Sequence, residues 1–203
     1  NTISCDHPFG HCITYSPDNK YLLAVFSDEV MSIWDVETGS IINSLDLNQI
    51  PNIPKGVHSI ACDSTFEKVA LAEFGGIHVI SFLTDQVYSF EVNNPKSIAF
   101  SPDGRYLVAT SADGINLWDF VEGDTANMNL SDGIDPRVSQ IAFSSDGRQV
   151  VFVFDNIIGL LEISGGSNVQ TFGKSDSLYV GVSFCNDDKY IATISEEGII
   201  MIW

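Results

Sequence analysis

Positively charged residues are scarce in this sequence. Lys and Arg together number 9 among 203 residues, against 27 Asp and Glu, so the formal net charge is −18. The few cations are scattered singly along the chain. Nucleic-acid backbones and anionic membrane surfaces attract clustered Lys and Arg, so the composition argues against both as partners. A basic protein partner is compatible with this charge.

Long apolar runs are missing as well. The longest, such as Val150–Phe154, are far shorter than the roughly 20 residues that cross a bilayer. Hydrophobic residues still make up 44% of the sequence and charged residues 18%, which excludes a disordered composition. We therefore expect a folded chain with a sizeable core and no membrane span.

Motifs that carry catalysis are absent. The sequence has no Gly-x-Ser-x-Gly nucleophile elbow and no Gly-rich phosphate loop. His58 precedes a predicted strand, and His78 alternates with apolar residues in another, so we expect a packed histidine at 78 rather than a general base. Asp132 and Asp135 share a loop but lack the acidic series of a calcium site. We predict no catalytic residue and no cofactor.

Metal-ligating residue types gather only near the start of the sequence. Cys5, His7, His11 and Cys12 suit zinc by type, but their spacing differs from the usual cysteine pairs. Adjacent His11 and Cys12 would also point to opposite sides of an extended chain. We therefore expect a loop before the first strand and no metal.

The four cysteines do not form the framework of a small disulfide-rich domain. They are spread along the whole chain, and Cys62 and Cys185 fall inside apolar runs. We expect these two to be buried thiols that act as small hydrophobic groups. Reduced thiols indicate an intracellular protein, and we take the cytoplasm as the expected location.

What the sequence does contain is a repeat of roughly 40 residues. Its marker is a turn, which reads Tyr-Ser-Pro-Asp-Asn-Lys from Tyr15, Phe-Ser-Pro-Asp-Gly-Arg from Phe100 and Phe-Ser-Ser-Asp-Gly-Arg from Phe143. Weaker copies begin at Cys62 and Phe184. Pro fixes φ, Asp bonds the nearby backbone and Gly accepts a positive φ, so each copy predicts a tight connection between two strands.

The segments between these turns predict short β-strands. Tyr106–Ser111, Val150–Phe154 and Tyr190–Ser195 are rich in β-branched and aromatic residues and lack a helical period. Several are apolar on both faces, which indicates sheets that are covered on both sides. Four such strands in each unit of about 40 residues are typical of a propeller blade.

The third predicted strand of three units ends in a tryptophan. The residues are Trp34-Asp35, Trp118-Asp119 and the final Trp203. Together with the turns, and with turn residues Asp18, Asp103 and Asp146, they make the sequence similar to WD40-repeat proteins over essentially its whole length. The third unit matches the family pattern closely, whereas the second and fourth are degenerate. The units are also similar to arrays appended to multidomain signalling NTPases.

The resemblance implies an all-β fold of five repeats with four-stranded antiparallel blades. The repeats are expected at about 1–47, 48–92, 93–130, 131–172 and 173–203. The fifth reaches only its third strand, so we favour part of a larger ring of six to eight blades. A closed five-bladed ring is the alternative, in which Thr2–Ser4 would complete the last blade as family propellers often do.

One family feature is incomplete here. In the family, a His, a Ser, a turn Asp and the Trp form a buried hydrogen-bonded tetrad. Ser111, Asp113 and Trp118 match three members, and Ser27, Asp28 and Trp34 are a possible second set. Gly10-His11 lies too close to the first repeat's turn to match, so no His completes either set. We expect weaker blades than in an ideal array.

The resemblance also implies a function. Family members most often receive peptides or proteins on the face that carries the short acidic turns and the connections between units. The candidate partner-binding residues on that face are Asp28, Glu29, Phe74, Asp113, Asp132, Asp135, Asp155, Asp176, Glu196 and Glu197. Phe26, Phe74 and Phe154 precede acidic turns, which would place aromatics near the rim.

We therefore predict a non-catalytic protein-interaction scaffold that binds a partner peptide or protein, with a basic segment favoured. Two alternatives remain. One is a propeller enzyme, either a cofactor-dependent dehydrogenase or a hydrolase, and the other is a structural or regulatory module of a larger multidomain protein.

Overall fold

The protein is described by a computed structural model, which covers residues 7, 10–16, 19–51, 53, 55–84, 86–120, 126–129, 138–163, 169–185 and 187–203. The chain divides into two compact units, Asn1–Asn94 and Pro95–Trp203. Within the described ranges, all regular structure is β-strand apart from one short 3-10 helix. No helix in this part of the chain is long and apolar enough to cross a membrane.

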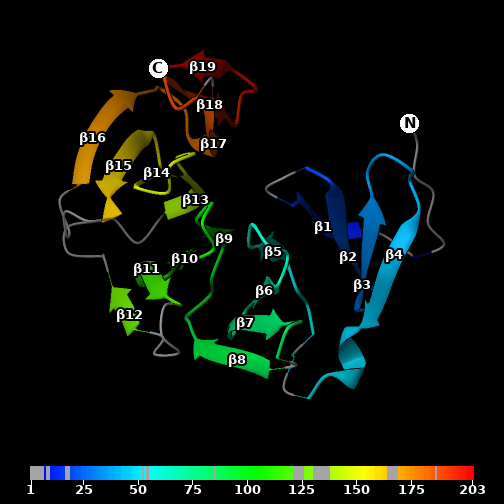
Figure 1. Cartoon of the computed structure of the whole chain (residues 1–203). Coiled ribbons are helices and arrows are strands. Elements are labelled where there is room, and N and C mark those ends of the chain that lie inside the picture. Colours follow the sequence, from blue (N-terminus) through cyan, green and yellow to red (C-terminus); the bar gives the residue numbers. More distant parts are fainter. Residues whose placement is uncertain are drawn as a thin grey trace. The chain divides into compact units, whose positions relative to one another are not determined.

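The first unit holds two four-stranded antiparallel sheets, each with its strands in chain order (Figure 1). The first sheet consists of β1 (Gly10–Tyr15), β2 (Tyr21–Phe26), β3 (Val30–Asp35) and β4 (Ile41–Asp46). The 3-10 helix η1 (Leu47–Gln49) follows. The second sheet consists of β5 (Ser59–Cys62), β6 (Lys68–Glu73), β7 (Gly76–Ser81) and β8 (Gln86–Glu91).

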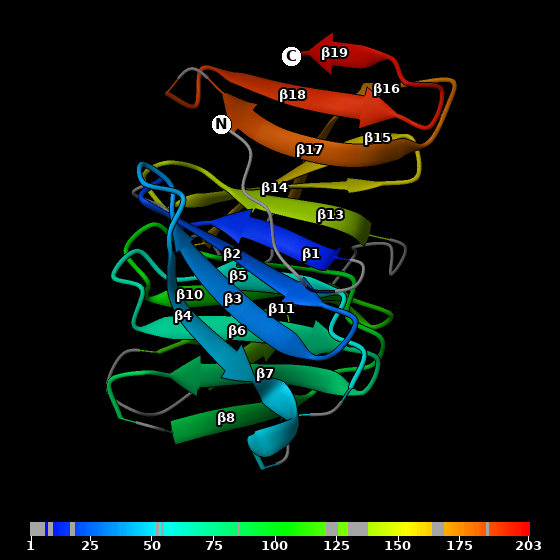
Figure 2. The same cartoon turned by 90° about the vertical axis from the view of Figure 1, so that its right-hand side faces the viewer.

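The second unit holds three antiparallel sheets built in the same way. Its first sheet consists of β9 (Ser97–Phe100), β10 (Tyr106–Ser111), β11 (Gly114–Asp119) and β12 (Ala126–Asn129). The next consists of β13 (Val138–Phe143), β14 (Gln149–Phe154), β15 (Ile157–Glu162) and β16 (Val169–Lys174). The last consists of β17 (Tyr179–Cys185), β18 (Tyr190–Ser195) and β19 (Ile200–Ile202), with β19 at its edge (Figure 2).

The Ser-Pro-Asp type turns have the geometry that their residues predict. In the third repeat, the Ser101 hydroxyl donates to the Asp103 carboxylate and accepts the Tyr106 N–H at 2.8 Å, while Gly104 has a φ of 70°. In the fourth repeat, Ser144 and Asp146 bond in the same way. Each turn is thus closed by side-chain to backbone bonds, as predicted from Pro, Asp and Gly chemistry. Asp18 lies outside the described residues.

The Trp-Asp pairs occupy one register position. Trp34 pairs with Leu22 and Trp118 with Leu107, and both indole rings are buried. Trp203 is 37% exposed, although it pairs with Ile191 at the equivalent position, because β19 forms the edge of its sheet. Burial of the Trp therefore depends on what covers its sheet and not on the register alone.

Each sheet interior is apolar on both faces, as the sequence predicts. In β14, Val150 and Phe152 pack with β10 and β11 side chains such as Val108, whereas Val151 and Val153 pack with Tyr179 of β17 and its neighbours. In the first unit, a single cluster joins β2 and β3 to β6 and β7. Fully burying one such side chain contributes about 1.5–3 kcal/mol, so sheet-to-sheet packing is the main source of stability.

Two expectations about the cysteines have different outcomes. Cys62 is buried in β5, as predicted. Cys185 is only half-buried at the end of β17, so its expected burial is wrong. It lies one residue beyond the apolar part of the strand, where the chain enters a turn. Cys12, Cys62 and Cys185 are free thiols.

Candidate functional site

The predicted partner-binding residues gather at one end of each sheet. We call the turns that join the second and third strands the acidic turns, namely residues 27–29, 74–75, 112–113, 155–156 and 196–199. Seven of the predicted residues lie in them: Asp28, Glu29, Phe74, Asp113, Asp155, Glu196 and Glu197. Asp176 lies between β16 and β17, and Asp132 and Asp135 lie outside the described residues.

Two of the carboxylates are engaged in bonds within the first unit. Glu29 adopts a φ of 61°, and its side chain accepts the Gly56 N–H at 3.0 Å, which holds the connection between the first two sheets. Asp28 lies 2.9 Å from Nδ1 of His7. This hydrogen bond is the main reason that the pKa of Asp28 lies below its ordinary value. Both acidic side chains therefore hold the conformation of the turn and also contribute to its negative charge.

His7 contacts Asp28 of the possible second set, although it does not occupy the Gly-His position of the family pattern. The His7 ring also stacks on Phe26 at 4.7 Å, and Phe26 meets Trp34 edge-on at 6.0 Å. The Trp34 indole nitrogen is buried and has no hydrogen-bond partner among the described residues, so the full tetrad does not form. His7 was missed because it lies 21 residues from Asp28 and carries no Gly-His signature.

In the third repeat, Asn116 bonds the Ser of the incomplete tetrad. The Asn116 side-chain amide donates to the Ser111 hydroxyl at 3.0 Å, and the same hydroxyl accepts the Asp113 N–H at 3.1 Å. All three atoms belong to β10, β11 or the acidic turn between them. The acidic turn of this repeat is thus ordered by an amide rather than by an imidazole.

Of the three aromatic residues expected near the rim, only Phe74 is exposed to solvent. Its side chain is 73% exposed, whereas Phe26 is buried and Phe154 half-buried. The His58 ring lies 5.3 Å from the Phe74 ring, which positions it at the tip of the turn between β6 and β7. Phe74 is therefore an apolar group presented by an acidic turn.

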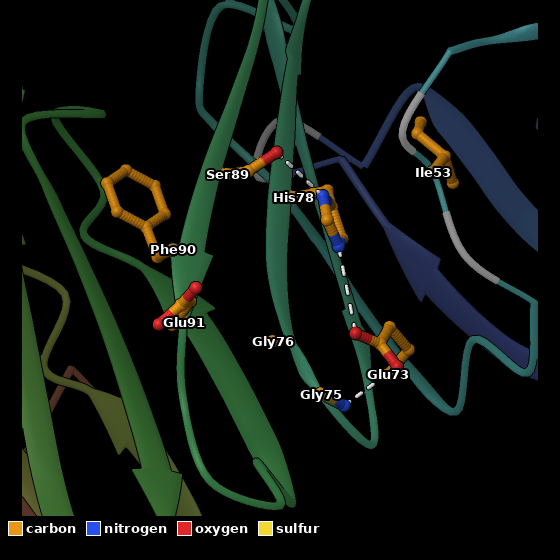
Figure 3. A pocket seen from close by; sticks show the side chains of 8 residues that line it. All are labelled: Ile53, Glu73, Gly75, Gly76, His78, Ser89, Phe90 and Glu91. Atoms are coloured by element: carbon orange, nitrogen blue, oxygen red, sulfur yellow. Dashed lines mark hydrogen bonds and ion pairs between the residues drawn. The ribbon is translucent and has the colours of Figure 1, made fainter.

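In the same sheet, a chain of polar side chains crosses the strands β6, β7 and β8 (Figure 3). Nδ1 of His78 on β7 lies 2.9 Å from the Ser89 hydroxyl on β8, and Nε2 lies 3.7 Å from the Glu73 carboxylate at the end of β6. The other oxygen of Glu73 accepts the Gly75 N–H at 2.8 Å. His78 and Glu73 are both buried residues. The strand register aligns them, because His78 pairs with Leu71 on one side and Ser89 on the other.

The polar chain borders a cavity of about 480 Å³ inside the first unit. Glu73, Gly76, His78 and Glu91 line it, and Ile53 from the connection between the sheets faces His78 from across the space (Figure 3). Only glycine fits at residue 76, because a Cβ there would lie 2.5 Å from the Phe90 carbonyl oxygen. The cavity wall therefore has no side chain at this point. The cavity therefore presents two carboxylates and one imidazole, and the acidic turn that carries the exposed Phe74 contributes Gly75 to its lining.

His78 is neutral at neutral pH. Burial lowers its pKa below the ordinary value, more than the nearby Glu73 carboxylate raises it. Nδ1 of His78 and the Ser89 hydroxyl share a hydrogen bond, in which the donor is set by the tautomer of the imidazole.

Ser89, His78 and Glu73 have the residue types of a hydrolytic triad, but the rest of the site differs from one. The Gly75 N–H is used by Glu73, and Gly76 is held in the ladder opposite Glu91, so neither is positioned as an oxyanion donor. The acid also lies 3.7 Å from the imidazole, beyond hydrogen-bond distance. The geometry favours binding over catalysis.

The structure describes only some of the four residues near the start of the chain that were considered as metal ligands. Cys5 and the side chain of His11 lie outside the described part, and burial raises the pKa of the Cys12 thiol to about 11. Within the residues that are described, no group of three or more His, Cys, Asp or Glu side chains is placed to hold a metal ion.

Comparison with known proteins places these observations in a family. The model of the WD domain, G-beta repeat, matches residues 4–35 and 84–119. The chain contains WD40 repeats. Periodic tryptophan protein 2 of Saccharomyces cerevisiae is 28% identical over 55% of this WD40 chain and 12% of its own length. WD repeat-containing protein 26 homolog of Arabidopsis thaliana is 25% identical over 94% of this chain and 25% of its own length.

Solved structures show the same fold. The structure of U3-55K has a TM-score of 0.79 at 15% identity, and it covers 99% of this WD40 chain and 62% of its own. The β-propeller domain of Cps50 (Swd1) from Myceliophteria thermophila has a TM-score of 0.76 at 13% identity, over 100% of this chain and 66% of its own. The chain thus folds as WD40 β-propeller blades and spans about two thirds of these solved propellers and a smaller part of the curated relatives.

Proposed function

We propose that this WD40 chain is a non-catalytic scaffold that binds a protein partner through its acidic turns, and that the bound segment is basic. The observation that carries the proposal is Phe74, a largely exposed aromatic on an acidic turn next to a cavity with two carboxylates. Aromatic side chains are enriched among the anchors of protein interfaces, and surrounding charges set the sign of the partner.

The net charge of −18 supports a protein partner over a nucleic acid. One relative is named a U3 small nucleolar RNA-associated protein 21 homolog, and another is Autophagy-related protein 16. We propose an intracellular location for this chain as well, with the cytoplasm as the compartment, since its described cysteines are free thiols.

An array of short peptides graded by net charge tests the scaffold. We expect binding to increase with positive charge and to fall several-fold as salt is raised from about 0.05 to about 0.5 M. The variant Asp113→Asn plus Asp155→Asn removes two charges from the acidic turns, and Asn tolerates the φ of 49° at residue 155. We expect this variant to bind basic peptides at least about threefold more weakly.

A matched control removes the same charge elsewhere. Glu37→Gln plus Glu162→Gln changes two exposed carboxylates at the other ends of β3 and β15. We expect its binding to remain within about twofold of the parent chain. Equal losses in the two variants, or binding that ignores peptide charge, would count against the acidic turns as the docking surface.

A further inference from the structure

The cavity beside Phe74 carries a charge that its own lining leaves uncompensated. Its described lining residues are Ile53, Glu73, Gly75, Gly76, His78, Ser89, Phe90 and Glu91, which include two carboxylates and no Lys or Arg. A buried carboxylate is costly unless it is paired, and neutral His78 and the Gly75 N–H supply only dipoles. A cation entering this space would be stabilised by both acids.

The strands place Glu91 where it can receive such a cation. Glu91 pairs with Gly76, and His78 pairs with Ser89, so these four residues occupy one face of the β7–β8 ladder. Because Gly76 has no side chain, Glu91 has no cross-strand side-chain partner in that pair. Glu73 reaches the same space from the end of β6.

Apolar and polar walls together set the kind of cation. Ile53 closes the side of the cavity opposite His78 (Figure 3), which suits the methylene stem of a long side chain. A guanidinium is planar and weakly hydrated and donates in a fork to carboxylates, so it tolerates a half-enclosed site better than an ammonium does. The volume of about 480 Å³ is ample for one such side chain.

We propose that this cavity receives an arginine side chain of the protein partner, with Glu73 and Glu91 as its acceptors and Ile53 as the apolar contact for its methylene stem. The inference rests on the proposed scaffold function and adds a specific residue to it. The Gly75 N–H holds the Glu73 carboxylate in place, and Nε2 of His78 lies 3.7 Å from it in the same lining.

The test uses the whole chain and a probe that isolates one side chain. Nα-acetyl-arginine-N-methylamide is titrated at neutral pH while NMR follows the Gly75 amide and the His78 ring. We expect saturable shifts at both. The citrulline analogue, which has nearly the same shape without the charge, should give none. Non-saturable shifts, or equal shifts from both compounds, would overturn the inference.

Two variants test whether the arginine probe binds in the cavity. Glu73→Gln keeps an acceptor for the Gly75 N–H, and Glu91→Gln changes an exposed side chain that the fold does not need. We expect each to weaken arginine-probe binding about fivefold to tenfold. The control Glu67→Gln changes the exposed acid that precedes β6 at its other end and should leave binding unchanged.

A basic peptide that contains lysine but no arginine separates this inference from the broader function. If that peptide binds the parent chain while the arginine probe gives no saturable shift, the cavity inference is wrong and the scaffold stands. If the probe saturates and Glu73→Gln weakens it about fivefold or more, the cavity is an arginine site, and failure of the lysine peptide would then count only against the acidic turns as a general docking surface.

Discussion

The sheets β5–β8 and β13–β16 have the same pairing at the centre of their second and third strands, but one sheet holds a polar residue there and the other holds only apolar residues. At the position four residues into the second strand and its partner on the third, β6 and β7 hold Leu71 and His78, whereas β14 and β15 hold Phe152 and Gly159. In the first case the imidazole links to Glu73 and Ser89. In the second, the Phe152 ring occupies the space that a Gly159 side chain would take.

The comparison shows what the repeat constrains. The other four-stranded sheets hold Ser32 and Asn116 at the position of His78 and Gly159. At this position of the third strand, the space must be filled to the usual packing density and buried polar atoms must be hydrogen-bonded. Different residue types meet these two conditions in different repeats. A polar chain beside a cavity is therefore a property of the second repeat and not of the repeat pattern.

Phe152→Ala should have the largest effect on this comparison. The Phe152 ring is fully buried and fills the site above Gly159, so its removal leaves a cavity that Gly159 does not fill. We expect a loss of about 3–5 kcal/mol in the free energy of unfolding, measured by urea titration of the whole chain. A loss below about 1 kcal/mol would show that the sheet collapses around the missing ring.

Gly159→Ala tests the same contact from the other side. The added methyl group would overlap the Phe152 ring, so we expect a cost of about 1–3 kcal/mol in the free energy of unfolding. In Phe152→Leu plus Gly159→Ala, the smaller side chain makes room for the methyl group. The double variant should therefore lose less than the sum of the two single changes. Strict additivity would contradict the direct contact.

His78→Ala tests the polar version of the position. It removes the partner of the Ser89 hydroxyl and the group nearest Glu73, so we expect a loss of about 1–3 kcal/mol by the same urea measurement. His78→Gln, which keeps a donor and an acceptor, should recover part of the loss. Full stability of the alanine variant would indicate that water replaces the imidazole without cost.

The smallest expected effect concerns the turns at the other end of the sheets. The Arg148 N–H and the Ser144 hydroxyl donate to Asp146 and lower the pKa of its carboxyl group. A lowered folded-state pKa means that the carboxylate stabilises the fold above its unfolded-state pKa, and that this contribution is lost as the pH falls through the folded-state value. Carboxyl NMR titration should place Asp146 below an unpaired aspartate such as one in a short peptide, and an ordinary pKa would contradict the turn geometry.

Local chemistry explains how much of the fold could be predicted. The turn at Ser101-Pro102-Asp103-Gly104 specifies its own geometry within four residues, and the alternation around Val150–Phe154 indicates burial on both faces. The candidate site depends on contacts between strands. Glu73, His78 and Ser89 meet only because of the register across β6, β7 and β8, and a shift of one residue would separate them. The contact between His7 and Asp28 likewise joins distant segments.

Side chains such as Val150 and Val151 point into different neighbouring cores, so both faces of β14 are covered by apolar side chains. A charged substitution on either side of this strand would face hydrocarbon, so in β14 polar side chains are tolerated only at its two ends. In β7 the two roles coincide, because His78 lines the cavity and also bonds to Ser89 within the sheet, so changing the cavity there also changes the stability of the blade.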